Sequence, residues 1–166
     1  MSNIFQLHSN SFNDGDYLSK DHALSTAYGF GCDGGNISPE LHWENTPKET
    51  KSLALTMFDP DAPTGSGFWH WSIINMPANT KNIPLGISNQ TNSTIPGLET
   101  RTDFGKSGYG GPCPPEGNHP HRYIFTIYAV SVASLDVNEE TSAAVIGFQL
   151  NFNTIKKATL MGLFKR

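Results

Sequence analysis

Apolar residues along the chain fall into short runs with the spacing of β-strands, separated by turn-forming residues. The strongest run covers residues 121–132, in which His121 and Tyr123 begin an alternation that places apolar side chains on one face of a strand. Residues 51–58 are rich in Leu and Met on both faces, which is typical of a strand buried on both sides. Four further runs have the same strand character: residues 4–8, 41–43, 69–76 and 157–164. We expect Gly162 to break the last of them.

One segment near the C-terminus has helical spacing instead. Val145, Phe148 and Phe152 recur three and four residues apart. Asn138, followed by two glutamates, is typical of a helix N-cap with acidic residues in the first turn. Residues 77–98 are polar and are predicted to be mostly loop. Several strands with one helix predict a β-sandwich-like domain.

Length and composition favour one domain with many turns. A chain of 166 residues corresponds to a single domain, residues 1–166, and a hydrophobic content of 37% is enough for a core. The 16 glycines and 11 prolines suit an all-β domain better than a helix bundle. A formal net charge of −4 with no long basic run argues against nucleic acid as a partner.

No segment has the features of a targeting or membrane-spanning sequence. Residues 1–5 have neither a positive n-region nor an apolar h-region. No apolar run reaches the ~18 residues that a membrane span needs. We therefore expect a cytoplasmic protein without a membrane span. In that compartment Cys32 and Cys113 should be reduced thiols.

Two loop stretches carry the candidate chemistry, and each lies at the mouth of a predicted strand. The first is the Asp-Pro-Asp-Ala-Pro corner at 59–63, followed by Trp69-His70-Trp71. Its two prolines fix two φ angles, so the corner is rigid. The second is the Gly/Pro-rich loop 108–117, which leads into His121. Taken alone, the first stretch could also be a stiff turn with exposed aspartates.

Together these stretches predict a small pocket for a phosphate-like or carboxylate group. The backbone N–H groups of a glycine-rich loop bind anions, and the imidazoles of His70 and His121 would add donors. Asp59 fits such a site if it orients one of the histidines or meets a cationic part of the ligand. The alternative is that each histidine is satisfied by local hydrogen bonds.

Two other chemistries are weaker. A zinc site could draw on His119, His121, Asp59, Asp61 and Cys113, but Pro120 makes a shared strand face for the two histidines doubtful. A small hydrolase could use His70, His121 and Asp59, but the sequence offers no convincing nucleophile. We therefore expect no catalytic residue, no metal ion and no cofactor.

The motifs as a set resemble the phosphatidylethanolamine-binding protein family, also called the Raf kinase inhibitor-like family. The resemblance covers essentially the whole chain. The matching segments are residues 59–63, 69–71, 111–117 and 121–123. Residues 31–39 and 160–166 also match, and these two segments resemble the family's bacterial and archaeal branch.

This resemblance implies a fold, a cleft and a class of function. The fold would be two antiparallel sheets packed as a Greek-key-type β-sandwich, with one or two short helices. A polar cleft for phosphate, phosphoethanolamine or similar anions would be lined by Asp59, Pro63, His70, Pro114, His121 and Tyr123. The Ala62–Pro63 bond is a candidate cis peptide. The family's members are non-catalytic binding proteins that regulate or inhibit kinases or proteases. We leave open whether this chain forms a homodimer.

Overall fold

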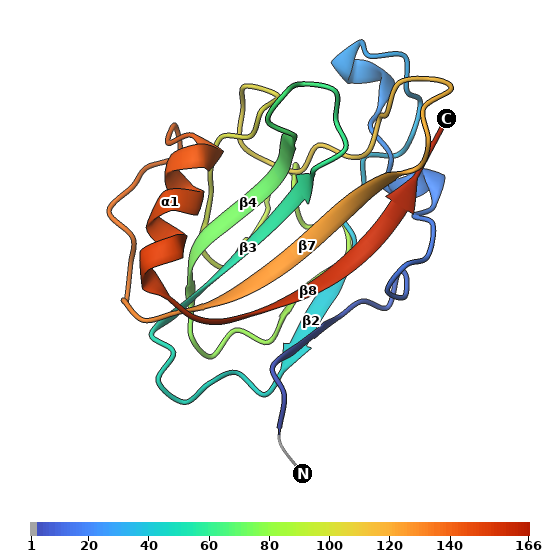
Figure 1. Ribbon diagram of the computed structural model, residues 1–166. Helices are drawn as coiled ribbons and strands as arrows, with labels where there is room; N and C mark the ends of the chain where they lie inside the picture. Colours follow the sequence, from blue (N-terminus) through green and yellow to red (C-terminus); the bar gives the residue numbers. More distant parts are fainter. Residues whose placement is uncertain (1–2) are drawn as a thin grey trace.

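A five-stranded antiparallel sheet is built from the strands with the strongest apolar patterning. The computed structural model describes residues 3–166, so Met1 and Ser2, the start of the segment in which we expected no leader, lie outside the described residues. The strand order is β6-β4-β3-β7-β8, and β3 and β7 lie in the middle (Figure 1). The bounds are β3 Ser52–Asp59, β4 Phe68–Pro77, β6 Leu98–Glu99, β7 His121–Val130 and β8 Thr154–Phe164.

A smaller sheet of three short antiparallel strands completes the β structure. Its order is β1-β2-β5, with β1 at Gln6–His8, β2 at Leu41–Glu44 and β5 at Asn82–Ile83. The helical elements are two single 3-10 turns, η1 (Lys20–His22) and η2 (Thr26–Tyr28), and the helix α1 (Ala143–Asn153). The predicted class, a mainly β protein with two antiparallel sheets and short helices, is confirmed.

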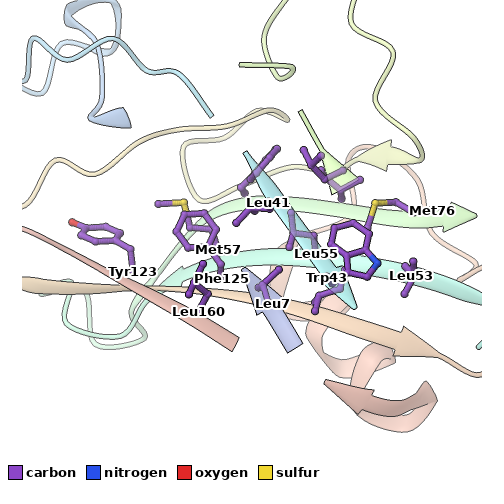
Figure 2. Close-up of a cluster of buried hydrophobic side chains, with 14 of the residues drawn as sticks. Leu7, Leu41, Trp43, Leu53, Leu55, Met57, Met76, Tyr123, Phe125 and Leu160 are labelled. Carbon is purple, nitrogen blue, oxygen red and sulfur yellow. The ribbon is translucent and has the colours of Figure 1, made fainter. Parts of the chain in front are cut away.

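The main core lies between the two sheets. Leu53, Leu55 and Met57 of β3 point into it, where they meet Leu41 and Trp43 of β2 (Figure 2). The intervening residue Ala54 belongs to a second apolar cluster that includes residues of α1. Because β3 is covered on both faces, its apolar run has no polar alternation, as the sequence predicts.

Helix α1 begins later than the sequence predicts. Ser142, not Asn138, is the N-cap, and its hydroxyl accepts a hydrogen bond from the N–H of Val145 at 3.4 Å. Ile146 and Leu150 are buried against the sheet, whereas Phe148 and Phe152 are 66% and 70% exposed. The helical spacing of the aromatic residues was therefore a correct signal for a helix, but they lie on its outer face.

Strand β8 is not broken at Gly162, contrary to the sequence prediction. Gly162 pairs with Tyr123 within the continuous ladder between β7 and β8. A Cβ at Gly162 would lie 2.6 Å from the side chain of Leu18. The glycine therefore gives space to a core residue of the N-terminal segment, and the backbone continues as a strand.

Across residues 3–166, none of the helices has the length and apolar character of a membrane span.

Candidate functional site

The two candidate stretches meet at one end of the large sheet and form a cleft of about 180 Å³. The corner after β3, the first residues of β4 and β7, and the loop 108–117 each contribute to its lining. All six side chains expected at the site line this one cleft: Asp59, Pro63, His70, Pro114, His121 and Tyr123. The spatial expectation on which the site rests is therefore met, while ligand binding by these residues stays a prediction.

His70 reaches the cleft through an irregularity in the sheet. Met57 pairs with Trp71, but the next residue of β3, Phe58, pairs with Trp69. His70 is thus the extra residue of a β-bulge, a feature that redirects side chains near functional sites. Strict alternation would put His70 on the face opposite to Trp71, yet the His70 ring lies 5.3 Å from the ring of Tyr123, which belongs to the same core cluster as Trp71. The bulge therefore places the side chains of two consecutive residues, His70 and Trp71, on the same side of the sheet.

The His70 ring is fixed by one hydrogen bond and three aromatic rings. Its Nδ1 lies 2.7 Å from the carbonyl oxygen of Gly110, and the Gly110 N–H returns a bond of 3.1 Å to the His70 carbonyl. Phe68, Phe104 and Tyr123 approach the imidazole edge-on with centroid distances of 5.1–5.4 Å. Burial among these rings lowers the pKa of His70 below its ordinary value, because the charged form is not solvated.

Asp59 and His121 form a buried pair on the floor of the cleft. The two side chains are only 3% and 1% exposed, and His121 Nδ1 donates to Asp59 Oδ2 at 2.8 Å. The other carboxylate oxygen of Asp59 accepts the backbone N–H of Asp61 at 2.8 Å. The second ring nitrogen of His121 lies 3.2 Å from Asn118 Oδ1. Asp59 therefore both holds the corner and orients His121, as the sequence analysis anticipated for a histidine partner.

Tyr123 supplies a hydroxyl to the same floor. Tyr123 is 1% exposed, and its burial together with the nearby Asp59 carboxylate raises the pKa of the phenol. The hydroxyl stays protonated over the whole physiological range. It is therefore a permanent hydrogen-bond donor.

Asp61 has a different role from Asp59. It does not line the cleft but accepts hydrogen bonds from Arg122 Nε at 3.0 Å, from Nη2 at 2.9 Å and from the Arg122 backbone N–H at 2.9 Å. The guanidinium holds the pKa of the Asp61 carboxyl at about 2. Asp61 therefore ties the corner to β7 as an ion pair and is not a partner for Asp59 in acid–base chemistry.

The glycine-rich loop does not present its central amides to the cleft, contrary to the sequence prediction. The N–H of Tyr109 donates to Ser88 Oγ, that of Gly110 to the His70 carbonyl, and that of Gly111 to Asn36 Oδ1. Three of the next four positions are prolines, which have no N–H. Gly111 is needed for close packing, since a Cβ there would lie 2.0 Å from the carbonyl oxygen of His22.

Two expectations about covalent geometry are wrong. Cys32 and Cys113 are joined by a disulfide, not reduced, and their Cα atoms lie 6.0 Å apart. Sequence reasoning addressed only the compartment, whereas the Asn36 side chain links the two loops: its Oδ1 accepts the N–H of Gly111 and its Nδ2 donates to the Tyr109 carbonyl. The Ala62–Pro63 bond is trans, and residues 3–166 contain no cis peptide bond.

The walls of the cleft are apolar, whereas the sequence analysis expected a polar lining. Beyond the six predicted residues, the lining consists of Leu24, Phe30, Ala62, Thr64, Phe68, Phe104, Cys113 and Pro115. No motif signalled Leu24, Phe30 or Phe104, because they come from loops whose approach depends on the tertiary fold. Apart from Thr64, whose hydroxyl donates to the Gly67 carbonyl, the polar lining groups lie at the floor, so the cleft has largely apolar walls with hydrogen-bonding groups at its base.

The structure gives no support to the zinc alternative. His119 is exposed, and its Nδ1 lies 2.9 Å from the carbonyl oxygen of Pro120. Cys113 is committed to the disulfide. Within residues 3–166, no three His, Cys, Asp or Glu side chains gather in a way that could hold a metal ion.

Known proteins are similar to this chain in both sequence and fold. The chain is 46% identical over 160 residues to the UPF0098 protein YbhB of Escherichia coli K12, an alignment that covers 96% of this chain and 99% of that protein. It is 41% identical to the UPF0098 protein YbcL of the same organism over 163 residues, with 97% and 87% covered. The crystal structure of E. coli YbcL superimposes with a TM-score of 0.92 over 98% of each chain.

A homologue from Chlamydia trachomatis extends the similarity. Its crystal structure gives a TM-score of 0.82 at 30% identity over 99% of each chain. The sequence model of the phosphatidylethanolamine-binding protein family matches residues 8–165. The chain therefore belongs to the phosphatidylethanolamine-binding protein family, in its bacterial and archaeal UPF0098 branch.

Proposed function

We propose that this protein is a non-catalytic binding protein for a small anionic ligand, such as phosphate or a phosphoethanolamine-like compound. The observation that carries the proposal is the convergence of His70, His121 and Tyr123, around the buried Asp59, at the base of a cleft of about 180 Å³. A volume of this size accepts a phosphate-sized group and a short substituent. The apolar walls exclude water from the floor, which strengthens each hydrogen bond made there.

The fixed orientation of the floor supports binding. Asp59 holds His121, Gly110 holds His70, and burial keeps the Tyr123 hydroxyl protonated. A ligand therefore meets side chains that do not have to be ordered on binding, which reduces the entropic cost of association.

A hydrolase is the second candidate, because the Asp59–His121 pair has the geometry of a general base with its orienting acid. Such an enzyme also needs a nucleophile or an activated water. Among the lining residues, Thr64 donates its hydroxyl to the carbonyl of Gly67, and Cys113 is in a disulfide. These commitments favour the binding function.

The binding proposal is tested by calorimetric titration of inorganic phosphate. His121→Ala should weaken phosphate binding at least about tenfold, since it removes one floor group and leaves the Asp59 carboxylate unpaired. His42→Ala is the matched control, because His42 is half-buried on β2 and lies outside the cleft. Equal phosphate affinity in His121→Ala and the parent would refute the site. Turnover of p-nitrophenyl esters that disappears in His121→Ala would favour the hydrolase instead.

A protein partner is the finer part of the proposal. The family resemblance suggests a kinase or protease whose activity the protein regulates, with the cleft ligand and the partner competing or cooperating. Inhibition of a purified kinase or protease that is relieved by saturating phosphate would support this coupling. Sedimentation equilibrium would separate a homodimer from a monomer.

The cellular location can be tested through the two cysteines. A cytoplasmic location, expected from the sequence, would keep Cys32 and Cys113 reduced unless their disulfide resists the glutathione pool, and the structure has them bonded. Alkylation in freshly lysed cells followed by mass spectrometry distinguishes the cases. Two alkylated thiols would support the cytoplasmic prediction, and none would favour an oxidising compartment.

A further inference from the structure

The direction of the hydrogen bonds on the cleft floor restricts the ligand beyond its size. The Gly110 carbonyl can only accept, so the 2.7 Å contact requires a hydrogen on Nδ1 of His70. In a neutral imidazole the other nitrogen then carries a lone pair. Nε2 has no hydrogen-bond partner within the described residues, and the ring lines the cleft. A neutral His70 therefore offers the ligand an acceptor, not a donor.

The surroundings of His70 keep its ring neutral. The side chain is enclosed by Phe68, Phe104 and Tyr123, and its burial lowers the pKa despite the carboxylates of Asp59 and Asp103, which act in the opposite direction. The remaining titratable groups that face it are His121 and the phenol of Tyr123. No Lys or Arg is among the residues that line the cleft.

The floor as a whole carries no net positive charge. If His121 is protonated, it is neutralised by Asp59 at 2.8 Å; if His121 is neutral, the pair has a charge of −1. The backbone amides of residues 109–111, which could have balanced a dianion, are bonded within the protein. A doubly charged ligand would thus lose its hydration without gaining a counter-charge.

We propose that the cleft selects an oxyanion that carries its own hydrogen, namely a phosphate monoester in its singly protonated form, over sulfate esters and phosphodiesters of equal charge. The inference rests on the proposed anion-binding function and specifies its ligand class. The P–OH group donates to His70 Nε2, while an unprotonated phosphoryl oxygen accepts from the Tyr123 hydroxyl. A phosphodiester, as in an intact phospholipid, has no P–OH and leaves the His70 lone pair unmatched.

The test compares methyl phosphate with methyl sulfate and dimethyl phosphate by calorimetry at about pH 5.5, below the second phosphate pKa of about 6. All three probes then carry a single negative charge, and only methyl phosphate has an O–H. Its affinity should be at least about tenfold higher, since the other two leave a buried acceptor unsatisfied. Above about pH 6 its affinity should fall about tenfold for each pH unit as the P–OH ionises.

His70→Asn separates the lone pair from the rest of the site. An Asn amide can still donate to the Gly110 carbonyl, but it has no group at the position of Nε2. The preference for methyl phosphate over methyl sulfate should fall to about twofold or less in this variant. A clear preference that survives in His70→Asn would overturn the assignment to His70.

The outcomes also separate this inference from the proposed function. If methyl sulfate and methyl phosphate bind the parent protein equally, the cleft is an anion site but the inference is wrong. If none of the three probes binds, the proposed function fails and the inference fails with it.

Discussion

The disulfide between Cys32 and Cys113 should account for a large part of the stability of the fold. The two cysteines are 81 residues apart, so the bond closes a long loop in the unfolded chain. The chain-entropy relation for such a loop gives a loss of about 15 cal/mol/K, or about 4.5 kcal/mol at 25 °C. Domains of this size unfold with about 5–15 kcal/mol in total. Removing the bond should therefore leave a folded but much less stable protein.

The variant to make is Cys32→Ala/Cys113→Ala, because replacing both residues leaves no free thiol. Urea unfolding can be followed through tryptophan fluorescence, since Trp71 is buried in the core at 1% exposure. With a urea m-value of about 2 kcal/mol/M, the midpoint should fall by about 2 M. Near-UV circular dichroism should stay the same, because a cross-link acts mainly on the unfolded state.

A reducing agent supplies the internal control. Dithiothreitol should lower the midpoint of the parent protein to near that of the double variant and should not affect the double variant itself. A double variant that unfolds within about 1 kcal/mol of the oxidised parent would refute the loop-entropy argument. It would mean that the contacts between the two loops already restrict the unfolded ensemble.

Three further predictions concern the backbone and the ion pair at the corner. Arg122→Gln should reduce stability only slightly at neutral pH, since the Arg122 side chain is 51% exposed and water screens its ion pair with Asp61. The Asp61 carboxyl has a folded pKa of about 2, below its ordinary value of 3.8. Its stabilising effect is therefore present above about pH 4 and lost as the pH falls toward 2. Urea midpoints should show this loss of stability in the parent protein but not in Arg122→Gln. Gly111→Ala should destabilise by about 3 kcal/mol, because its Cβ would lie 2.0 Å from the His22 carbonyl oxygen, and unchanged thermal stability would contradict the packing argument. Gly147→Ala should instead stabilise by about 0.5–1 kcal/mol, since a Cβ in this helix meets nothing within 4 Å, and a lowered melting temperature would argue against it.

Local patterns predicted the strands well because they record burial directly. The alternation at the start of β7 placed His121 and Tyr123 on one face, and both are buried there. The uniform apolar run of β3 matched a strand covered by the small sheet on one side and α1 on the other. What failed was the interpretation of single residues. Gly162 was taken as a strand breaker, but its role is to make room for Leu18, a contact between segments far apart in sequence.

The candidate site was predictable in its members but not in its polarity. The motifs identified Asp59, His70 and His121 because polar residues at rigid strand mouths are unusual. They could not show that a bulge redirects His70, since a register shift depends on the partner strand. They also could not show that Asn36 takes the N–H of Gly111, which removes a donor that the loop composition seemed to offer the ligand.

A buried carboxylate in a site for anions is explained by what its two oxygens do. Asp59 Oδ2 accepts from His121 and Oδ1 accepts the N–H of Asp61, so both oxygens are used to fix the protein. His121 also contacts protein atoms through both ring nitrogens, Asp59 Oδ2 on one side and Asn118 Oδ1 on the other, so it acts by holding Asp59 in place. The groups left to meet a ligand are then the imidazole of His70 and the hydroxyl of Tyr123, one an acceptor and the other a donor. An acceptor beside a donor matches a phosphoryl group that has kept one hydrogen, and for such a ligand the nearby negative charge of Asp59 favours retention of that hydrogen.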